Sequence, residues 1–348
     1  MRIRNRVLLS LLLCVIAMCY PSYNYLQSSF SREIVSLTTT VPSNVNTRSD
    51  VQQGSIRICS QRERKSHIQK MCQTLDVLRT PQRKEFIVDE RHKVAYCSIP
   101  KVASSTWNRL MMMSQMPNRN VTKSFKTSHK KHILRDVYGL RFERNVTRLQ
   151  NYTKFLVVRN PYTRLISAYR DKIASERDKN APFFKLRKIL KSFEAGRKTE
   201  EEPVKLETFL MHVLFSSRAP SHLRFNQHWV PYLALCNPCA VDYDVILRTE
   251  TMTHDSAPVL EKLGFTMQDL TRQTKNVDPA YRTKSNNTTA SLTSFSEHLG
   301  SKVEIKRSHV ELLQQRYGLE ELLFGYTLDK KTGVTGCAID TMNSGKCC

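Results

Sequence analysis

The stretch from Lys93 to Met113, KVAYCSIPKVASSTWNRLMMM, decides the fold. Its first part, Lys93 to Ile99, is a short apolar run typical of a buried strand, and Ser105 to Met113 has the spacing of the helix that follows. One lysine and a row of hydroxyl residues stand where the strand turns into the helix. Backbone amides at a helix N-terminus and a nearby ammonium group together bind phosphate-like anions. The stretch therefore predicts an anion-binding loop; an ordinary surface lysine is the alternative interpretation of Lys101.

The order of strand and helix recurs along the chain. Apolar runs predict further strands at Lys154 to Val158 (KFLVV) and Tyr243 to Leu247 (YDVIL). Helical spacing follows each of them, through Leu165, Ile166, Tyr169 and Ile173 and again over Ser256 to Leu263, and a late helix is predicted over Val310 to Leu323. Repeated strand and helix units predict an α/β fold with a parallel central sheet flanked by helices. Ligands of such sheets bind at the carboxyl ends of the strands.

A second candidate anion site begins where the strand Lys154 to Val158 ends. Arg159 stands at the strand end, and Ser167 follows two helical turns later. A guanidinium offers paired donors to phosphate oxygens, whereas a structural arginine with a surface serine is the alternative. Two anion sites at neighbouring strand ends could hold one nucleotide with phosphates at both ends. We therefore expect the two loops to converge in space.

The charge of the chain limits its partners. Its 348 residues include 55 Lys and Arg against 31 Asp and Glu, a net charge of +24. Such a surplus predicts a polyanionic partner, which on charge alone could be nucleic acid, anionic lipid or an acidic polysaccharide. The basic stretch from Lys179 to Lys205 is predicted to be a surface insertion, or simply a solvated face.

The N-terminal residues predict entry into the secretory pathway. MRIRNR carries three arginines, and residues 7–20 that follow have no charge. This apolar segment is shorter than the roughly 20 residues of a usual span, so a cleaved signal peptide is the alternative to a retained signal anchor. Both place the remainder in the lumen. The expected polyanion is therefore a glycan, and nucleic acid is not expected.

Cysteines and glycosylation sequons agree with that location. Eight of the ten cysteines lie beyond the apolar segment, where disulfides are stable. Cys236 and Cys239 have the spacing of half a zinc site, but no second pair matches it. We therefore predict structural disulfides, with the pairing left open, and no metal. Asn-X-Ser/Thr sequons occur at Asn120, Asn145, Asn151, Asn286 and Asn287.

Taken together, these motifs resemble the Golgi carbohydrate sulfotransferases, specifically the chondroitin and dermatan 4-O-sulfotransferase branch. PKVASSTWNRLMM is similar to that family's 5′-phosphosulfate loop, and RNPYTRLISAYRDK to its 3′-phosphate loop. The resemblance spans roughly residues 94–327 and continues in FNQHW (Phe225 to Trp229), LCNPC (Leu235 to Cys239), YDVILRTETM (Tyr243 to Met252) and the spacing of Tyr317, Phe324 and Tyr326. It implies a P-loop-like sulfotransferase fold and 3′-phosphoadenosine 5′-phosphosulfate (PAPS) as the donor.

The resemblance also implies roles for individual residues. Lys101 is expected to stabilise the charge that grows on the leaving phosphate oxygen. His129, 30 residues before Arg159, is the first candidate for the base that takes the acceptor proton; His228 is the second, with His132 and His222 behind them. Because His228 adjoins a tryptophan, it could instead be a packed structural residue. The residues expected to contact the donor are Pro100, Lys101, Val102, Ala103, Ser104, Ser105, Thr106, Arg159, Asn160, Pro161, Tyr162, Thr163, Arg164, Leu165, Ile166 and Ser167.

The implied protein is a single-pass type II Golgi membrane protein with its catalytic domain in the lumen. Its expected acceptor is a glycosaminoglycan, at O-4 of N-acetylgalactosamine in chondroitin or dermatan. The predicted segments are a cytosolic tail (1–6), a signal anchor (7–20), a luminal stem (21–85) with a helix within 58–78, a catalytic domain (86–330) and a C-terminal tail (331–348).

Three other functions stay open from the sequence. A sulfotransferase for another terminal sugar would share both loops. A luminal sugar kinase is disfavoured because the first loop lacks the glycines of a nucleotide loop and the chain lacks an evident magnesium-holding acid. A non-catalytic, polyanion-binding membrane protein would explain the charge and the anchor but not the paired loops.

Overall fold

The computed structural model describes part of the chain, all of it within the unit 55–348. The described residues are 60–74, 85–115, 130–174, 183–194, 202–215, 226–274, 307–328 and 335–337. The predicted tail, the predicted anchor and most of the predicted stem lie outside these ranges. Among the helices within them, none combines the length and the hydropathy that crossing a bilayer requires.

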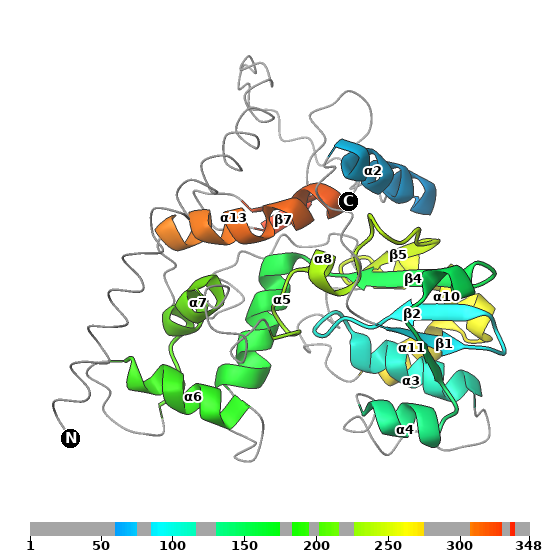
Figure 1. The fold of residues 1–348 in the computed structure, drawn as a ribbon, viewed down its shortest axis with the longest axis horizontal. Helices are drawn as coiled ribbons and strands as arrows, with labels where there is room; N and C mark the ends of the chain where they lie inside the picture. The colour runs from blue at the N-terminus through cyan, green and yellow to red at the C-terminus, as the bar shows by residue number, and fades with distance from the viewer. Residues whose placement is uncertain are drawn as a thin grey trace. The chain divides into compact units, whose positions relative to one another are not determined.

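A five-stranded mixed sheet forms the centre of the fold (Figure 1). Its strands, in spatial order, are β3 (Arg141–Glu143), β1 (Phe86–Asp89), β2 (Val94–Cys97), β4 (Thr153–Val158) and β5 (Val245–Arg248). The three predicted strands correspond to β2, β4 and β5, which are parallel to one another, with Cys97 opposite Leu156 and Val158 opposite Arg248. Neighbouring parallel strands end at the same edge, so the loops after β2 and β4 emerge side by side.

The sheet is mixed, whereas the sequence predicted a parallel one. On one side of the sheet, β1 pairs antiparallel with both β2 and β3. A short turn joins β1 to β2 and ends at Lys93, whose φ of 54° lies in the left-handed region. A connection this short permits only an antiparallel pair, whereas a parallel pair needs a crossover of a dozen or more residues.

Helices follow the strands and cover the sheet. α3 (Ser104–Gln115) follows β2 and packs beside β1, α10 and α11. The ring of Phe155 on β4 stacks on Tyr96 of β2 at 4.5 Å and meets Trp107 of α3 at 5.1 Å. The other elements that contribute to this hydrophobic cluster are α4 (Lys131–Asp136), the 3₁₀ turn η3 (Val146–Leu149), α8 (Tyr232–Leu235), α9 (Met252–Asp255), α10 (Ala257–Leu263) and α11 (Met267–Gln273).

A second group of helices has its own hydrophobic cluster. It consists of α5 (Pro161–Ala168), the π-helical turn η4 (Tyr169–Ala174), α6 (Phe183–Ser192), α7 (Leu206–Phe215) and α13 (Arg307–Phe324). Trp229 lies among them, with the ring of Phe209 at 5.2 Å, and its backbone carbonyl accepts a hydrogen bond from the hydroxyl of Tyr317 at 2.6 Å. Beyond α13, β6 (Tyr326–Leu328) pairs antiparallel with β7 (Thr335–Cys337). Of these two strands, β7 lies within the predicted C-terminal tail.

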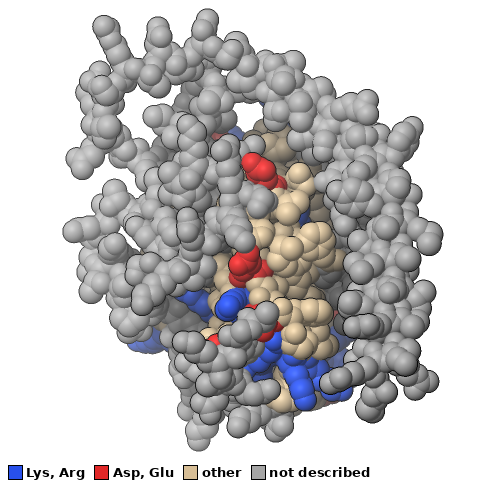
Figure 2. All heavy atoms as spheres, turned by 90° about the vertical axis from the view of Figure 1, so that its left-hand side faces the viewer, with Lys and Arg blue, Asp and Glu red and all other residues tan. Residues whose placement is uncertain are grey.

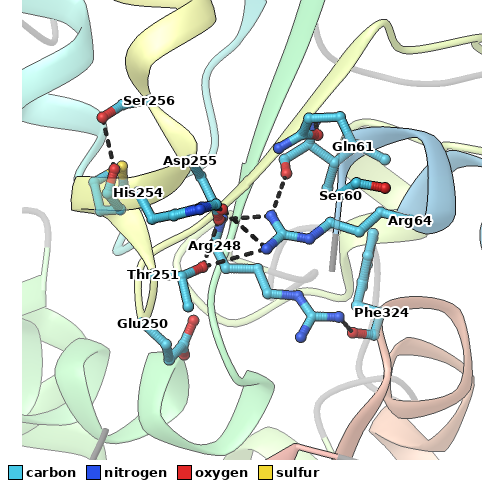
Figure 3. A network of polar contacts seen from close by, with 12 residues as sticks. Ser60, Gln61, Arg64, Arg248, Glu250, Thr251, His254, Asp255, Ser256 and Phe324 are labelled. Atoms are coloured by element: carbon cyan, nitrogen blue, oxygen red, sulfur yellow. Dashed lines mark hydrogen bonds and ion pairs between the residues drawn. The ribbon is translucent and has the colours of Figure 1, made fainter. Parts of the chain in front are cut away.

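The helix predicted within the stem is α2 (Gln61–Thr74), and it packs against β5 and α13 (Figure 1). Arg64 of α2 lies buried and donates to the carboxylate of Asp255 at 2.5 and 2.9 Å and to the carbonyl of Ile246 at 2.9 Å (Figure 3). A disulfide also joins Cys72 of α2 to Cys239. The helix is therefore part of the same folded body as the sheet.

Candidate active site

The loop between β2 and α3 has an unusual backbone. Lys101 and Ala103 have φ values of 74° and 62°, in the left-handed region that costs a residue with a Cβ roughly 1–2 kcal/mol. Alternating hands along a short segment turn successive amides toward one side and form an anion-binding concavity. Backbone strain of this kind concentrates at functional sites. The buried side chain of Val102, between the two strained residues, anchors the loop in the core.

The first turn of α3 continues this concavity. The carbonyl of Ala103 accepts the amides of Thr106 and Trp107, so the helix begins directly after the strained residues. Of the three predicted hydroxyl residues, Ser105 is partly exposed, whereas Ser104 and Thr106 are buried. The hydroxyl of Thr106 lies 3.5 Å from the carbonyl oxygen of Gln273 on α11. The loop thus offers amides, Lys101 and Ser105 to an anion.

Two side chains, of Asn160 and Tyr232, hold the backbone of the loop after β4. The amide oxygen of Asn160 accepts the amides of Tyr162 and Thr163 at 3.0 and 3.3 Å and caps α5, and Pro161 occupies the first helical turn. The hydroxyl of Tyr232 accepts the backbone N–H of Arg159 at 3.0 Å and donates to its carbonyl at 2.9 Å. The side chain of Arg159 donates from Nε to the hydroxyl of Thr163 at 3.0 Å. Its other guanidinium nitrogens can therefore still face a phosphate.

Arg164 fastens the two loops to each other. Its buried guanidinium donates to the carbonyls of Pro100 in the first loop (3.1 Å), Val230 (2.8 Å) and Gln227 (2.9 Å). It also lies over the ring of Tyr232 at 4.6 Å, and Tyr232 in turn holds Arg159. This connection brings the two predicted loops together, as the sequence led us to expect.

Lys101 points toward η4, where its ammonium nitrogen lies 2.8 Å from the carboxylate of Asp171. Burial lowers the pKa of Lys101, Asp171 raises it, and the charges of Lys172 and Arg159 lower it further, so that it lies below the usual value. Burial alone would raise the pKa of Asp171, but Lys101 and Lys172 hold it below its usual value. Lys101 and Arg159 are therefore close enough to repel each other, and an anion between them would relieve that repulsion.

His228 lies within the field of the same charges. Burial, then the charges of Lys172, Lys101 and Arg164, lower its pKa to about 3, so the ring is neutral at physiological pH. The amide oxygen of Asn226 accepts the backbone N–H of His228 at 3.0 Å and lies 2.5 Å from its Nδ1. Because that oxygen can only accept, Nδ1 carries the proton and Nε2 keeps its lone pair. The imidazole is thus in the form that can take up a proton.

The remaining predicted residues are distributed as follows. Tyr162, Leu165 and Ile166 are buried in the second hydrophobic cluster, so their side chains face the protein, and Ser167 is partly exposed on α5. His132 is exposed on α4. His129 and His222 lie outside the described residues.

Three residues of this site were missed by the sequence reasoning. Asp171 lies inside the quoted second motif, but only the bend of η4 turns it toward Lys101. Tyr232 follows a proline without any motif of its own. Glu320 of α13 accepts the backbone N–H of Tyr232, and burial raises its pKa to about 8. A search for clusters of three or more His, Cys, Asp or Glu that could hold a metal finds none in the described ranges.

Comparison with known proteins gives consistent matches. Residues 84–327 match the profile of the sulfotransferase family. Carbohydrate sulfotransferase 11 of Mus musculus is 29% identical over 261 residues, which cover 72% of this chain and 70% of that protein. Carbohydrate sulfotransferase 12 of Mus musculus is 28% identical over 316 residues (80% and 71%), and carbohydrate sulfotransferase 14 of Mus musculus is 34% identical over 180 residues (51% and 46%). No solved structure matches the chain significantly.

Proposed function

The chain belongs to the sulfotransferase family, and from this premise we propose that it transfers a sulfuryl group from PAPS to O-4 of N-acetylgalactosamine in chondroitin or dermatan chains. The family and the carbohydrate sulfotransferases among its relatives support an enzyme that sulfates a sugar with PAPS as donor. The observation that supports the site assignment is the hydrogen bond from Arg164 in the second loop to Pro100 in the first, together with the effect of the Arg159 charge on Lys101.

The residues of the two loops fit a donor with anionic groups at both ends. Lys101, Ser105 and the first amides of α3 would hold the 5′-phosphosulfate, and Arg159, with Ser167 further along α5, would hold the 3′-phosphate. When bound, PAPS supplies the sulfuryl group, which passes in line to the sugar oxygen while the bridging phosphate oxygen leaves. Lys101 stabilises the charge on that leaving oxygen more in the transition state than in the ground state. Asp171 orients the Lys101 ammonium group.

Replacing Arg159 by alanine is expected to raise the KM for PAPS about tenfold or more, because a charge-assisted bidentate contact to phosphate is lost. The effect on kcat at saturating donor should be smaller, since Arg159 binds the end that does not react. Measured initial rates at varied donor concentration separate the two constants. Arg148, exposed on η3, provides the matched control, and Arg148→Ala should leave both unchanged. A normal KM in Arg159→Ala would remove Arg159 from the donor site.

We assign the proton acceptor to His228 because its ring lies within the field of Lys101 and its Nε2 keeps its lone pair, and His129 stays the rival candidate. His228→Ala is expected to lower kcat by about 10²–10³-fold, within the range for general bases. Burial and the charges of Lys172 and Lys101 lower the pKa of His228 to about 3 in the protein without donor, so kcat/KM, which reports the free enzyme, should not fall near pH 6.5. A rate loss centred near 6.5, or a larger effect of His129→Ala, would transfer the role to His129.

A luminal Golgi location is also part of this proposal. Both described disulfides, Cys72–Cys239 and Cys97–Cys236, require an oxidising compartment, and Asn145 and Asn151 are exposed as sequons must be. A single-pass type II anchor at residues 7–20 would place the domain there. Glycosidase sensitivity of the expressed full chain and protection of its catalytic part from added protease test this topology. Cleavage by protease in sealed vesicles would contradict it.

The acceptor is tested directly by incubation of the full chain with sulfate-labelled PAPS and a panel of desulfated glycosaminoglycans, followed by disaccharide analysis. We expect label at O-4 of N-acetylgalactosamine in chondroitin or dermatan. Label on a different terminal sugar would keep the enzyme class and overturn the acceptor. Label from ATP in place of PAPS would identify a kinase, and no transfer from either donor would favour a polyanion-binding protein.

A further inference from the structure

Helix α6 exposes a face on which lysines and apolar side chains alternate. Phe184, Ile189 and Phe193 are 46%, 47% and 75% exposed, values that are high for such side chains in a soluble domain. Lys185 and Lys188 are exposed, and Lys191 is partly exposed. We call these six residues the α6 surface. It lies within the basic stretch that the sequence marked as a surface insertion.

The opposite face of α6 already has its partners, so core packing does not explain the exposed residues. Phe183, Arg187 and Leu190 are buried, and α6 packs on α7 and η4. Within the part of the chain that the structure describes, this packing leaves Phe184, Ile189 and Phe193 exposed.

Helix α6 contacts the transfer site through its buried face, opposite the α6 surface. Arg187 donates to the backbone carbonyl of Lys172 at 3.1 Å, next to Asp171. The ring of Phe183 lies 5.3 Å from that of His228, and the ammonium group of Lys172 lies 5.6 Å from the Phe183 ring centroid. Figure 2, which shows the left-hand side of Figure 1, has Lys and Arg side chains gathered in the lower part of that face, at the height of α6 in Figure 1.

We propose that the α6 surface docks the acidic polysaccharide acceptor beyond the sugar that reacts, an inference that rests on the proposed function. Lys185, Lys188 and Lys191 extend about 9 Å along the helix axis, more than one sugar ring needs, and their charge complements the carboxylates of a uronate-bearing chain. Aromatic rings between them can pack on the C–H faces of sugar rings.

The order of residues around the helix favours a glycan over a lipid surface. At 100° per residue, Phe184 falls between Lys191 and Lys188, and Lys185 falls between Lys188 and Ile189. A helix that lies in a membrane separates its apolar and charged faces, whereas here Phe184 lies among the lysines and Ile189 lies directly beside Lys185. A polymer that carries both acidic groups and apolar ring faces can contact both kinds of residue at once.

The test replaces the three lysines in Lys185→Gln/Lys188→Gln/Lys191→Gln, which leaves the buried face of α6 unchanged. The matched control removes three exposed lysines elsewhere, in Lys70→Gln/Lys130→Gln/Lys262→Gln. The full chain in phosphatidylcholine nanodiscs is assayed for direct binding of labelled desulfated chondroitin without donor, and for sulfation of long chondroitin chains and of a chondroitin disaccharide.

We expect the α6 variant, but not the control, to bind chondroitin about tenfold more weakly, a sum of three modest ion contacts, and to raise the KM for long chains similarly. Turnover of the disaccharide should stay at the wild-type value. Equal losses in both triple variants, or an equal loss with the disaccharide, would overturn the proposal. Protection of the three lysines from an amine-reactive label by phosphatidylserine in the nanodisc, but not by chondroitin, would assign the surface to lipid and also overturn it. Because binding is measured without transfer, failure of the proposed function is distinguishable from failure of this docking surface.

Discussion

Lys101→Ala is expected to lower kcat by about 10²–10³-fold, the usual effect of removing one group that stabilises charge in a transition state. The reason is the position of Lys101 between the strained loop and η4, where its ammonium group is largely buried. A cation in such a low-dielectric place acts more strongly on a developing negative charge than the same cation in water. Single-turnover rates with prebound donor measure the chemical step alone.

Two further variants separate this effect from damage to the fold. Lys101→Gly relieves the left-handed backbone, so it should fold at least as stably as the wild type and still lose activity. Lys65→Ala removes an ammonium group that also pairs with an aspartate, Asp242 at 2.9 Å, but on α2, and should retain full turnover. Normal kcat in folded Lys101→Ala would refute the assigned role. A comparable loss of kcat in Lys65→Ala would also contradict it, because the loss would then follow from removing any lysine charge and not from the position of Lys101.

The parts of the fold that the sequence predicted are those with local signals. Apolar runs marked β2, β4 and β5, because strands buried on both faces read as continuous apolar runs. The spacing of apolar residues over Ser105 to Met113 marked α3. The antiparallel strand β3 was missed because only one of its three residues is apolar. Strand β1 has the same length as β2 and β5, but its short apolar run FIV is bounded by the charged residues Glu85 and Asp89. The disulfide pairing could not be deduced at all, since eight cysteines allow many connectivities.

The site was predicted unevenly for a related reason. Arg159 directly follows β4 and Lys101 comes four residues after the end of β2, so the parallel pairing of these strands brings both to one edge of the sheet. Asp171, Tyr232 and Glu320 enter through contacts over long sequence separations, such as the 73 residues between Arg159 and Tyr232. The spacing of apolar residues along the chain carries no information about such long-range contacts. The same limit placed the boundary of the predicted catalytic domain at residue 86, although α2 packs on β5.

Arg64→Met is expected to destabilise the folded chain by about 3–5 kcal/mol, because it leaves the Asp255 carboxylate buried without its cation. Both side chains are at most 2% exposed, so water cannot replace the lost donors. The remaining partners of that carboxylate among the described residues are the backbone amide of Arg248, the hydroxyl of Thr251 and, at 3.4 Å, Nδ1 of His254 (Figure 3). The amide and the hydroxyl are uncharged, and the His254 side chain is 63% exposed, so it replaces the buried guanidinium only in part. Urea unfolding followed by tryptophan fluorescence gives the change in free energy of unfolding, and a fall in Tm of about 10 °C should accompany it.

The matched control is Arg62→Met on the exposed side of the same helix, which should change stability by less than about 0.5 kcal/mol. In the double variant Arg64→Met/Asp255→Leu the buried charge is absent, so the loss should be smaller than in Arg64→Met alone. If Arg64→Met were as stable as Arg62→Met, α2 would be a dispensable part of the stem. A chain truncated to begin at residue 86 should then fold as well as one that begins at residue 55, whereas the Arg64–Asp255 pair and the Cys72–Cys239 disulfide predict that only the longer chain folds.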